Sequence, residues 1–175
     1  MPGSHFIDEF NAEQERGSER GLVLVASSMA EELLRRLLMA FMVEGVEQRD
    51  FFDGPSSPLS SLSSRISMAH ALGLLTERER HVLGDLRKIR NAFAHQLSTS
   101  LSDDRFADLL RNRMLEIAPR ALQSVGDTPR NNFTVLVILM LSSIEARAIA
   151  AARDRRVIAT TDTMGSMSSP SQPIA

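Results

Sequence analysis

Apolar residues recur at three- and four-residue spacing along most of the chain, which is the spacing of one face of an α-helix. No segment shows the sustained alternation of apolar and polar residues that is typical of strands. The longest periodic segment runs from Ser18 to Val43, and Gly45 follows it as expected beyond a helix C-terminus. Its apolar positions are Leu22, Ala26, Met29, Leu33, Leu37 and Phe41. The pattern predicts an all-α protein.

Further helices are predicted on both sides of a loop in the middle of the chain. The segment Ser4–Arg16 can form a short amphipathic first helix, and a third helix is expected over Leu62–Leu72. Thr76 and Glu79 have the spacing of a capping box, which predicts the start of a long helix that runs to about Gln96 or Leu97. The stripe that we expect this helix to bury consists of Val82, Leu86, Ile89 and Phe93.

The C-terminal third contains two more expected helices. Ser102 is the predicted N-cap of a helix that Pro119 helps to end, and residues 123–132 read as a loop. The last helix should begin near Phe133 and is apolar on nearly all sides to Leu141, which predicts burial at the centre of a bundle. We therefore expect a single helical bundle of about five to seven helices over residues 1–159, and a disordered tail over residues 160–175.

Composition narrows the function classes. The 175 residues include no Cys, which excludes disulfides, Cys-ligated zinc and thiol nucleophiles. The net charge is −2, so binding to nucleic acid would need a local basic patch. The N-terminus lacks the pattern of a signal peptide, and the longest apolar run, residues 133–141, is too short to span a bilayer. We expect a cytoplasmic protein with no membrane contact and no cofactor.

The densest group of chemically active side chains lies at the end of the long predicted helix. Lys88, Asn91 and His95 share one helix face, and Arg87 lies beside it. Arg90 lies five residues before His95, about 140° around the helix at 3.6 residues per turn. A site that used both Arg90 and His95 would therefore need a second helix or a second subunit.

Arg90, Asn91 and His95 match the R-N-x-x-x-H pattern of the HEPN superfamily, which this segment resembles. That superfamily consists of small helical bundles, many of them dimeric, and several are metal-independent ribonucleases. The resemblance implies that His95 would move a proton, Arg90 would hold a phosphate and Asn91 would orient either group. The alternative is structural, because the same three side chains could bond loop carbonyls and helix ends and so lock the bundle or a dimer.

A second resemblance covers more of the chain, roughly residues 6 to 117. The sequence is similar to the mannitol operon repressor family at residues 20–26 and 31–34, at residues 58–66 and 69–74, and at residues 89–95. That family implies an all-helical regulator of sugar-alcohol uptake genes that lacks an ordinary DNA-reading domain and acts largely through other proteins. We therefore expect a homodimer that binds a protein partner such as another regulator. The expected partner surface consists of Arg87, Lys88, Arg90, Asn91 and His95.

A helix-turn-helix is a weaker interpretation of residues 68–74 and the helix that starts at Thr76. Glu79 occupies the position where the second helix should bury an aliphatic residue, and residues 77–80 mix charge signs where a DNA-reading helix would be basic. The pattern favours an ordinary helical hairpin and argues against direct DNA contact.

Two other polar patterns favour solvated surfaces. Glu77, His81 and Asp85 lie four residues apart and could offer metal ligands, but this spacing is also typical of a solvated helix face. We predict no metal site. The Arg-rich segment at residues 147–156 could touch RNA or an acidic partner, although such a helix end more commonly complements the helix dipole and stays in solvent.

Overall fold

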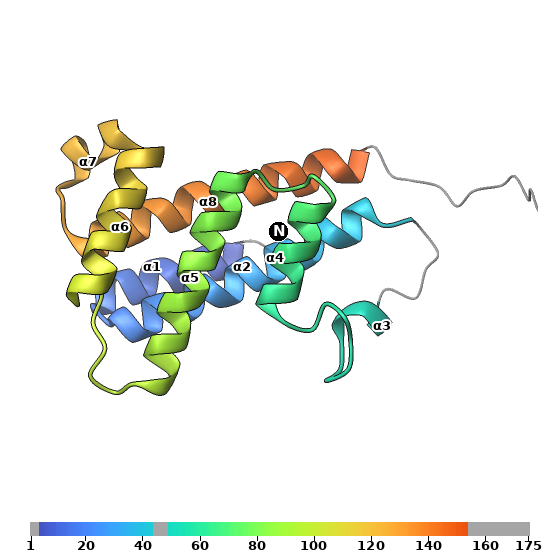
Figure 1. Ribbon diagram of the computed structural model, residues 1–175, viewed down its shortest axis with the longest axis horizontal. Helices are drawn as coiled ribbons and strands as arrows, with labels where there is room; N and C mark the ends of the chain where they lie inside the picture. The colour runs from blue at the N-terminus through green and yellow to red at the C-terminus, as the bar shows by residue number, and fades with distance from the viewer. Residues whose placement is uncertain (1–3, 44–48, 154–175) are drawn as a thin grey trace, which may run out of the picture.

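The computed structural model of the protein describes residues 4–43 and 49–153. Within those residues it contains eight α-helices and no strand, arranged as one bundle (Figure 1). The all-α prediction is confirmed, and the number of helices is one above the expected range. The expected tail at residues 160–175 lies outside the described residues. In chain order the helices are α1 (Ser4–Arg16), α2 (Glu19–Phe41), α3 (Arg49–Phe52), α4 (Leu62–Ala71), α5 (Glu77–His95), α6 (Asp104–Ile117), α7 (Pro119–Val125) and α8 (Pro129–Arg153).

Side-chain caps define several helix starts. The Ser18 hydroxyl accepts a hydrogen bond of 3.0 Å from the Gly21 N–H and begins α2. The predicted capping box at α5 is confirmed, since the Thr76 hydroxyl accepts from the Glu79 N–H at 3.3 Å and the Glu79 carboxylate accepts from the Thr76 N–H at 2.7 Å. An all-serine capping box begins α4.

The predicted end of α6 before Pro119 is confirmed, since α6 ends at Ile117, but Pro119 also begins a further helix, α7, that was not predicted. The predicted loop at residues 123–132 is too long, because α7 runs to Val125 and α8 begins at Pro129. Proline is well suited to the first turn of a helix, where its fixed φ is helical and its missing N–H would have no partner. The single-turn helix α3 was not predicted.

The predicted cap of α6 is also wrong. The N-cap residue is Asp103 in place of Ser102, and its side chain makes no cap hydrogen bond. The Asp103 carboxylate turns back and accepts a hydrogen bond of 3.3 Å from the N–H of Ser100. The start of α6 is therefore set by the loop that precedes it.

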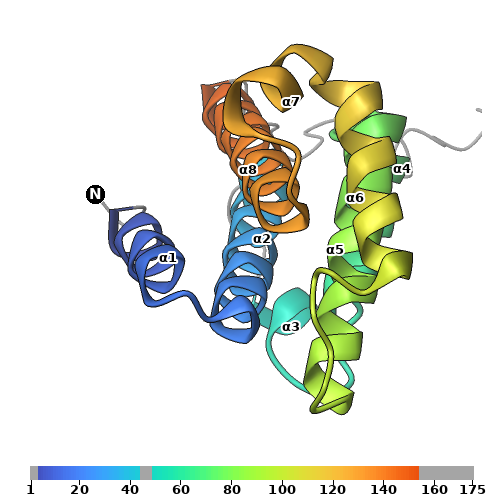
Figure 2. The same ribbon diagram turned by 90° about the vertical axis from the view of Figure 1, so that its left-hand side faces the viewer.

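The helices form three layers. α2 and α8 run side by side in the same direction and make the middle layer, and α4, α5 and α6 lie across one side of it (Figures 1 and 2). α1 lies on the opposite side, next to α2 (Figure 2). Most of the core lies between the middle layer and α4–α6, where large side chains such as Phe93, Phe133 and Ile144 are almost completely buried.

α8 is less enclosed than its composition predicts. Its inner side is buried, but Ile138 and Ile149 remain 49% and 53% exposed. By length and composition alone α8 could cross a membrane, with a mean hydropathy of 1.9 over its most apolar window, and it is the one helix in the described part of the chain with this property. The sequence prediction considered only residues 133–141 and so missed it. In this fold α8 packs along α2 and α6 as a core helix.

Candidate functional site

The helix α5 presents the predicted site residues to solvent. Its expected apolar stripe is confirmed as buried, with Val82, Leu86, Ile89 and Phe93 all in the core. The opposite side of the helix is therefore the exposed one. Arg90 is partly buried, whereas the four other predicted site residues are exposed, namely Arg87, Lys88, Asn91 and His95.

The C-terminal end of α5 is held in place by the start of α2. The Arg20 guanidinium donates hydrogen bonds to the carbonyls of Gln96 at 2.9 Å and Leu97 at 3.2 Å. The same guanidinium lies over the ring of Phe93, 5.9 Å from its centroid. A cation placed at the carbonyl end of a helix is favoured by the helix dipole. Arg20 therefore fixes the position of the last turn of α5.

Glu19 adds a second connection that the sequence reasoning missed. Its Oε2 atom accepts hydrogen bonds from the Ser100 hydroxyl at 3.0 Å and from the Leu101 N–H at 2.9 Å. The loop that follows α5 is thus tied to α2 on both sides of Leu97. The sequence offers one signal for these contacts. The N-cap residue Ser18 places Glu19 and Arg20 in the first turn of α2.

Lys88 is engaged in a network below the surface of α5. The Asp85 carboxylate is buried and accepts hydrogen bonds from Arg113 of α6, at 2.8 Å to Nη2 and 3.1 Å to Nε. Lys88 Nζ donates to the other carboxylate oxygen at 3.2 Å. Partial burial lowers the pKa of Arg113, but its bonds to Asp85 and Glu116 outweigh this effect and raise the pKa above its ordinary value. This network joins α5 to α6.

Arg87, Arg90 and Asn91 line a groove between α5 and the start of α4. The other lining residues are Ser60, Ser61, Leu62, Ser63 and Glu31, and the volume is about 460 Å³. Arg87 donates a hydrogen bond of 3.4 Å to the Ser63 hydroxyl, and Arg90 donates one of 3.4 Å to Asn91 Oδ1. We call this feature the serine–arginine groove. It combines two guanidinium groups with hydroxyl groups on one accessible surface.

His95 lies outside the serine–arginine groove. Its side chain is exposed and makes no hydrogen bond to another described residue. Within one chain the structure therefore brings Arg90 and Asn91 together and leaves His95 apart, which agrees with their angular separation on the helix. Among the described residues, the Arg90 side chain bonds only its neighbour Asn91 and does not tie α5 to a loop or a helix end of the same chain.

The start of α5 belongs to the core of the bundle. Glu79 Oε1 accepts hydrogen bonds from the Ser143 hydroxyl at 2.5 Å and from Arg147 Nε at 3.2 Å, both on α8. The expectation that the segment 147–156 stays in solvent is therefore wrong at Arg147, and residues 154–156 lie outside the described residues. Glu79 replaces the aliphatic contact of a helix-turn-helix with a polar one, and α4 and α5 form an ordinary hairpin packed on the bundle.

The carboxylates and histidines near the start of α5 are held by one another and by arginine. Glu77 pairs with His70 at 3.0 Å, with His81 at 3.1 Å and with Arg80, and the hydrogen bond from Arg80 is the largest cause that lowers the pKa of Glu77 to about 2. Asp85 faces α6 and does not join them. No cluster of three potential metal ligands is found among the residues that the structure describes.

One solved structure places the fold among known proteins. The chain is similar to the crystal structure of a possible transcriptional regulator, YggD, from Shigella flexneri 2a, with a TM-score of 0.58, 13% sequence identity, and coverage of 84% of this chain and 96% of that chain. No protein-family model matches the chain, and no curated protein matches it. At this identity the likeness shows a shared fold, and the two family resemblances rest on the sequence segments that carry them.

Proposed function

We propose that the protein is a cytoplasmic transcriptional regulator of the kind that the mannitol operon repressor resemblance implies. In this proposal it acts through protein–protein contacts made by the serine–arginine groove and the neighbouring cations of α5. The shared fold with a possible transcriptional regulator supports the general class. The observation that carries the mode of action is the groove itself, where Arg87 and Arg90 are accessible on a rigid helix.

The chemistry of the groove favours an acidic protein segment. Guanidinium groups bind carboxylates through paired, planar hydrogen bonds, and hydroxyl groups of Ser60 and Ser63 can complete the contacts. Glu31 at the edge of the groove would repel a uniformly anionic ligand and favours a partner that also offers a donor. A mixed peptide surface satisfies both conditions better than a continuous phosphate backbone does.

The test is a comparison of transcripts in the source organism. A chromosomal R87E/R90E variant should reproduce the transcript changes that deletion of the gene causes, because reversed charges would repel the acidic partner. The matched control is Arg120→Glu, an exposed arginine of α7 away from the groove, which should leave the transcripts as in the wild type. A deletion with no effect on any transcript, or an R87E/R90E strain that behaves as wild type, would refute the proposal.

A metal-independent ribonuclease is the second candidate, and the accessibility of its residues favours it. Arg90, Asn91 and His95 are not occupied by contacts that hold the bundle together. Since His95 lies outside the groove, a second copy would have to supply it to Arg90. The test is incubation with a mixed RNA pool in EDTA, where cleavage by the wild type but not by His95→Ala would establish the nuclease and intact RNA with both proteins would exclude it.

A further inference from the structure

The middle layer of the bundle is covered unequally on its two sides. α4, α5 and α6 cover its inner side, whereas α1 is the only described helix on the outer side and has 13 residues against the 25 of α8 (Figure 2). Phe10 of α1 is buried against this surface. Beyond it the outer surfaces of α2 and α8 have no neighbour in the described part of the chain. We call this surface the outer α2–α8 face.

Two hollows lie next to one another along the outer α2–α8 face. The first, about 190 Å³, lies between α1, α2 and α8 and has apolar walls that include Leu33 and Ile138. The second, about 310 Å³, lies between α2 and α8 beyond the end of α1 and includes Met39 and Ile149. Both hollows are also lined by Arg36 and by Glu145. They therefore form one strip along the two helices.

The strip is apolar, as is typical of a surface that binds another protein segment. α8 is the most apolar helix described, yet only 33% of its most apolar 18-residue window is buried. Small side chains at Ala40, Ala148 and Ala152 line the second hollow, so another helix could approach the backbone closely. A contiguous exposed apolar surface rimmed by polar residues marks an interaction site in soluble proteins.

The charged side chains on the strip indicate which partner covers it. Among the described residues, Arg36 makes no ion pair or side-chain hydrogen bond, and neither does Glu145. Glu32 also lines the first hollow, but it is paired with Arg35 at 4.0 Å, so Arg36 and Glu145 are the two charges of the strip that have no partner in the described part of the chain. One such cation and one such anion allow the strip to match a second copy of itself, because a two-fold axis makes each contact between two residues occur twice with the roles of the copies exchanged. A uniformly acidic partner would place a negative charge next to Glu145, and a uniformly basic partner would place a positive charge next to Arg36.

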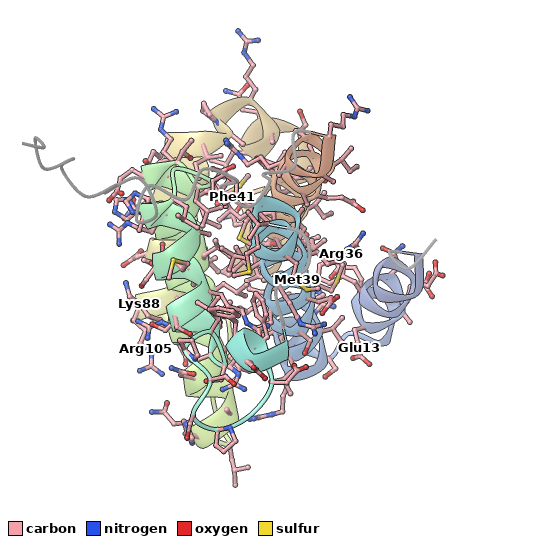
Figure 3. All side chains as sticks on the ribbon, turned by 90° about the vertical axis from the view of Figure 1, so that its right-hand side faces the viewer. Glu13, Arg36, Met39, Phe41, Lys88 and Arg105 are labelled. Carbon is pink, nitrogen blue, oxygen red and sulfur yellow. The ribbon has the colours of Figure 1, made fainter. Side chains whose placement is uncertain are left out.

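We propose that the outer α2–α8 face is the interface of a homodimer, in which Arg36 of each copy pairs with Glu145 of the partner subunit. The apolar walls of the hollows would supply the buried centre and the two reciprocal ion pairs the polar rim. Figure 3 shows Arg36 on the side of α1 and Lys88 on the opposite side of the molecule. The dimer would therefore leave the serine–arginine groove of both copies free, and it stands or falls independently of the proposed function.

The test uses native mass spectrometry and analytical ultracentrifugation of the full chain. Arg36→Glu should weaken dimerisation roughly tenfold or more, and Glu145→Arg should do the same, because each places like charges opposite each other. An equimolar mixture of the two variants should restore a dimer that contains one copy of each. The first variant carries two carboxylates on the face and the second two guanidinium groups, so the mixed dimer satisfies both pairs.

The mixture also shows whether Arg36 pairs with Glu145 of the partner subunit or with Glu145 of its own copy. Mixing restores dimerisation only if the ion pair joins two copies. Its recovery shows that both variants are folded. Arg87→Glu is the matched control on the opposite side and should dimerise as the wild type does. A monomeric wild-type chain, single variants with unchanged dimerisation, a mixture that stays monomeric, or a dimer broken by Arg87→Glu would each overturn the proposal.

Discussion

Glu79 of α5 and Ser143 of α8 are joined by a hydrogen bond of 2.5 Å across 64 residues of sequence. The same carboxylate accepts a hydrogen bond of 2.7 Å from the Thr76 N–H and so also completes the cap of α5. One side chain therefore caps the start of one helix and positions another. This double role explains why an acidic residue occupies a position that faces the bundle.

Removing this carboxylate should destabilise the protein. Glu79→Ala loses the cap and leaves Ser143 and Arg147 without their acceptor, so we expect the free energy of unfolding to fall by about 2–3 kcal/mol. Urea unfolding followed by circular dichroism measures this change. Asp108→Asn on the exposed side of α6 is the control and should change stability by less than about 0.5 kcal/mol. Equal losses for the two variants would contradict the role of Glu79.

The same contacts predict a loss of stability in acid. Burial raises the pKa of Glu79, but hydrogen bonds from Ser143 and Thr76 and the charge of Arg147 outweigh it and hold the pKa below its ordinary value of 4.5. The unfolded chain thus binds this proton more readily than the folded protein does. The stabilisation is complete above about pH 4.5 and is lost as the pH falls through the folded pKa. Unfolding measured from pH 6 to pH 3 should show a steeper loss for the wild type than for Glu79→Gln, and parallel curves would refute the linkage.

Breaking the connection between α5 and α6 from one side should be costly. Arg113→Ala leaves the buried Asp85 carboxylate with Lys88 as its only cationic partner among the described residues, and we expect a loss of about 3 kcal/mol in the free energy of unfolding. Lys88→Ala removes the exposed partner and should cost less than about 1 kcal/mol. Thermal unfolding of both variants compares them directly. A larger loss of stability for Lys88→Ala than for Arg113→Ala would contradict the conclusion that Arg113 is the main partner of Asp85.

His95 should contribute little to stability. Because its side chain is exposed and makes no hydrogen bond to another described residue, we expect His95→Ala to change the free energy of unfolding by less than about 0.5 kcal/mol. Chemical denaturation at pH 7.5 gives the value. A loss of 2 kcal/mol or more would favour the interpretation that His95 holds the bundle together.

Arg20 should contribute more to the free energy of unfolding than its place near the surface indicates. Arg20→Ala removes two hydrogen bonds to the end of α5 and the cation over the ring of Phe93, so we expect a loss of about 1–2 kcal/mol. Hydrogen exchange should show faster exchange confined to the last turn of α5. Arg20→Lys keeps the charge but cannot bond both carbonyls as guanidinium does, and it should recover only part of the loss.

Local signals in the sequence explain which parts of the fold were predictable. The buried stripe of α5 and its capping box depend on residues three and four positions apart, and both predictions are confirmed. The end of α6 before Pro119 was predicted, but the helix that Pro119 begins was not, because whether a proline starts a new helix depends on the chain that follows it. Which side of α8 is exposed was not predictable either. A helix that is apolar on all sides has no polar face to mark the side that its neighbours leave uncovered.

The candidate site was predictable only on its own helix. The outward direction of Arg87, Asn91 and His95 follows from the helical phase of the buried stripe. The serines that complete the groove come from the start of α4, and their approach depends on how the α4–α5 hairpin packs on α2. No spacing rule along the chain contains that information.

The middle layer also sets an order of events during synthesis. α2 lies against α8, yet everything from Met42 to Thr128 separates them in the sequence. A ribosome therefore releases α2 long before its partner exists, whereas the hairpin of α4 and α5 can form as soon as it emerges. The part of α2 that packs on α8 must wait in the nascent chain for the last described helix, whereas its contacts with α1, α4 and α5 can form earlier. That part of α2 is thus exposed to aggregation and to chaperones until translation is nearly finished.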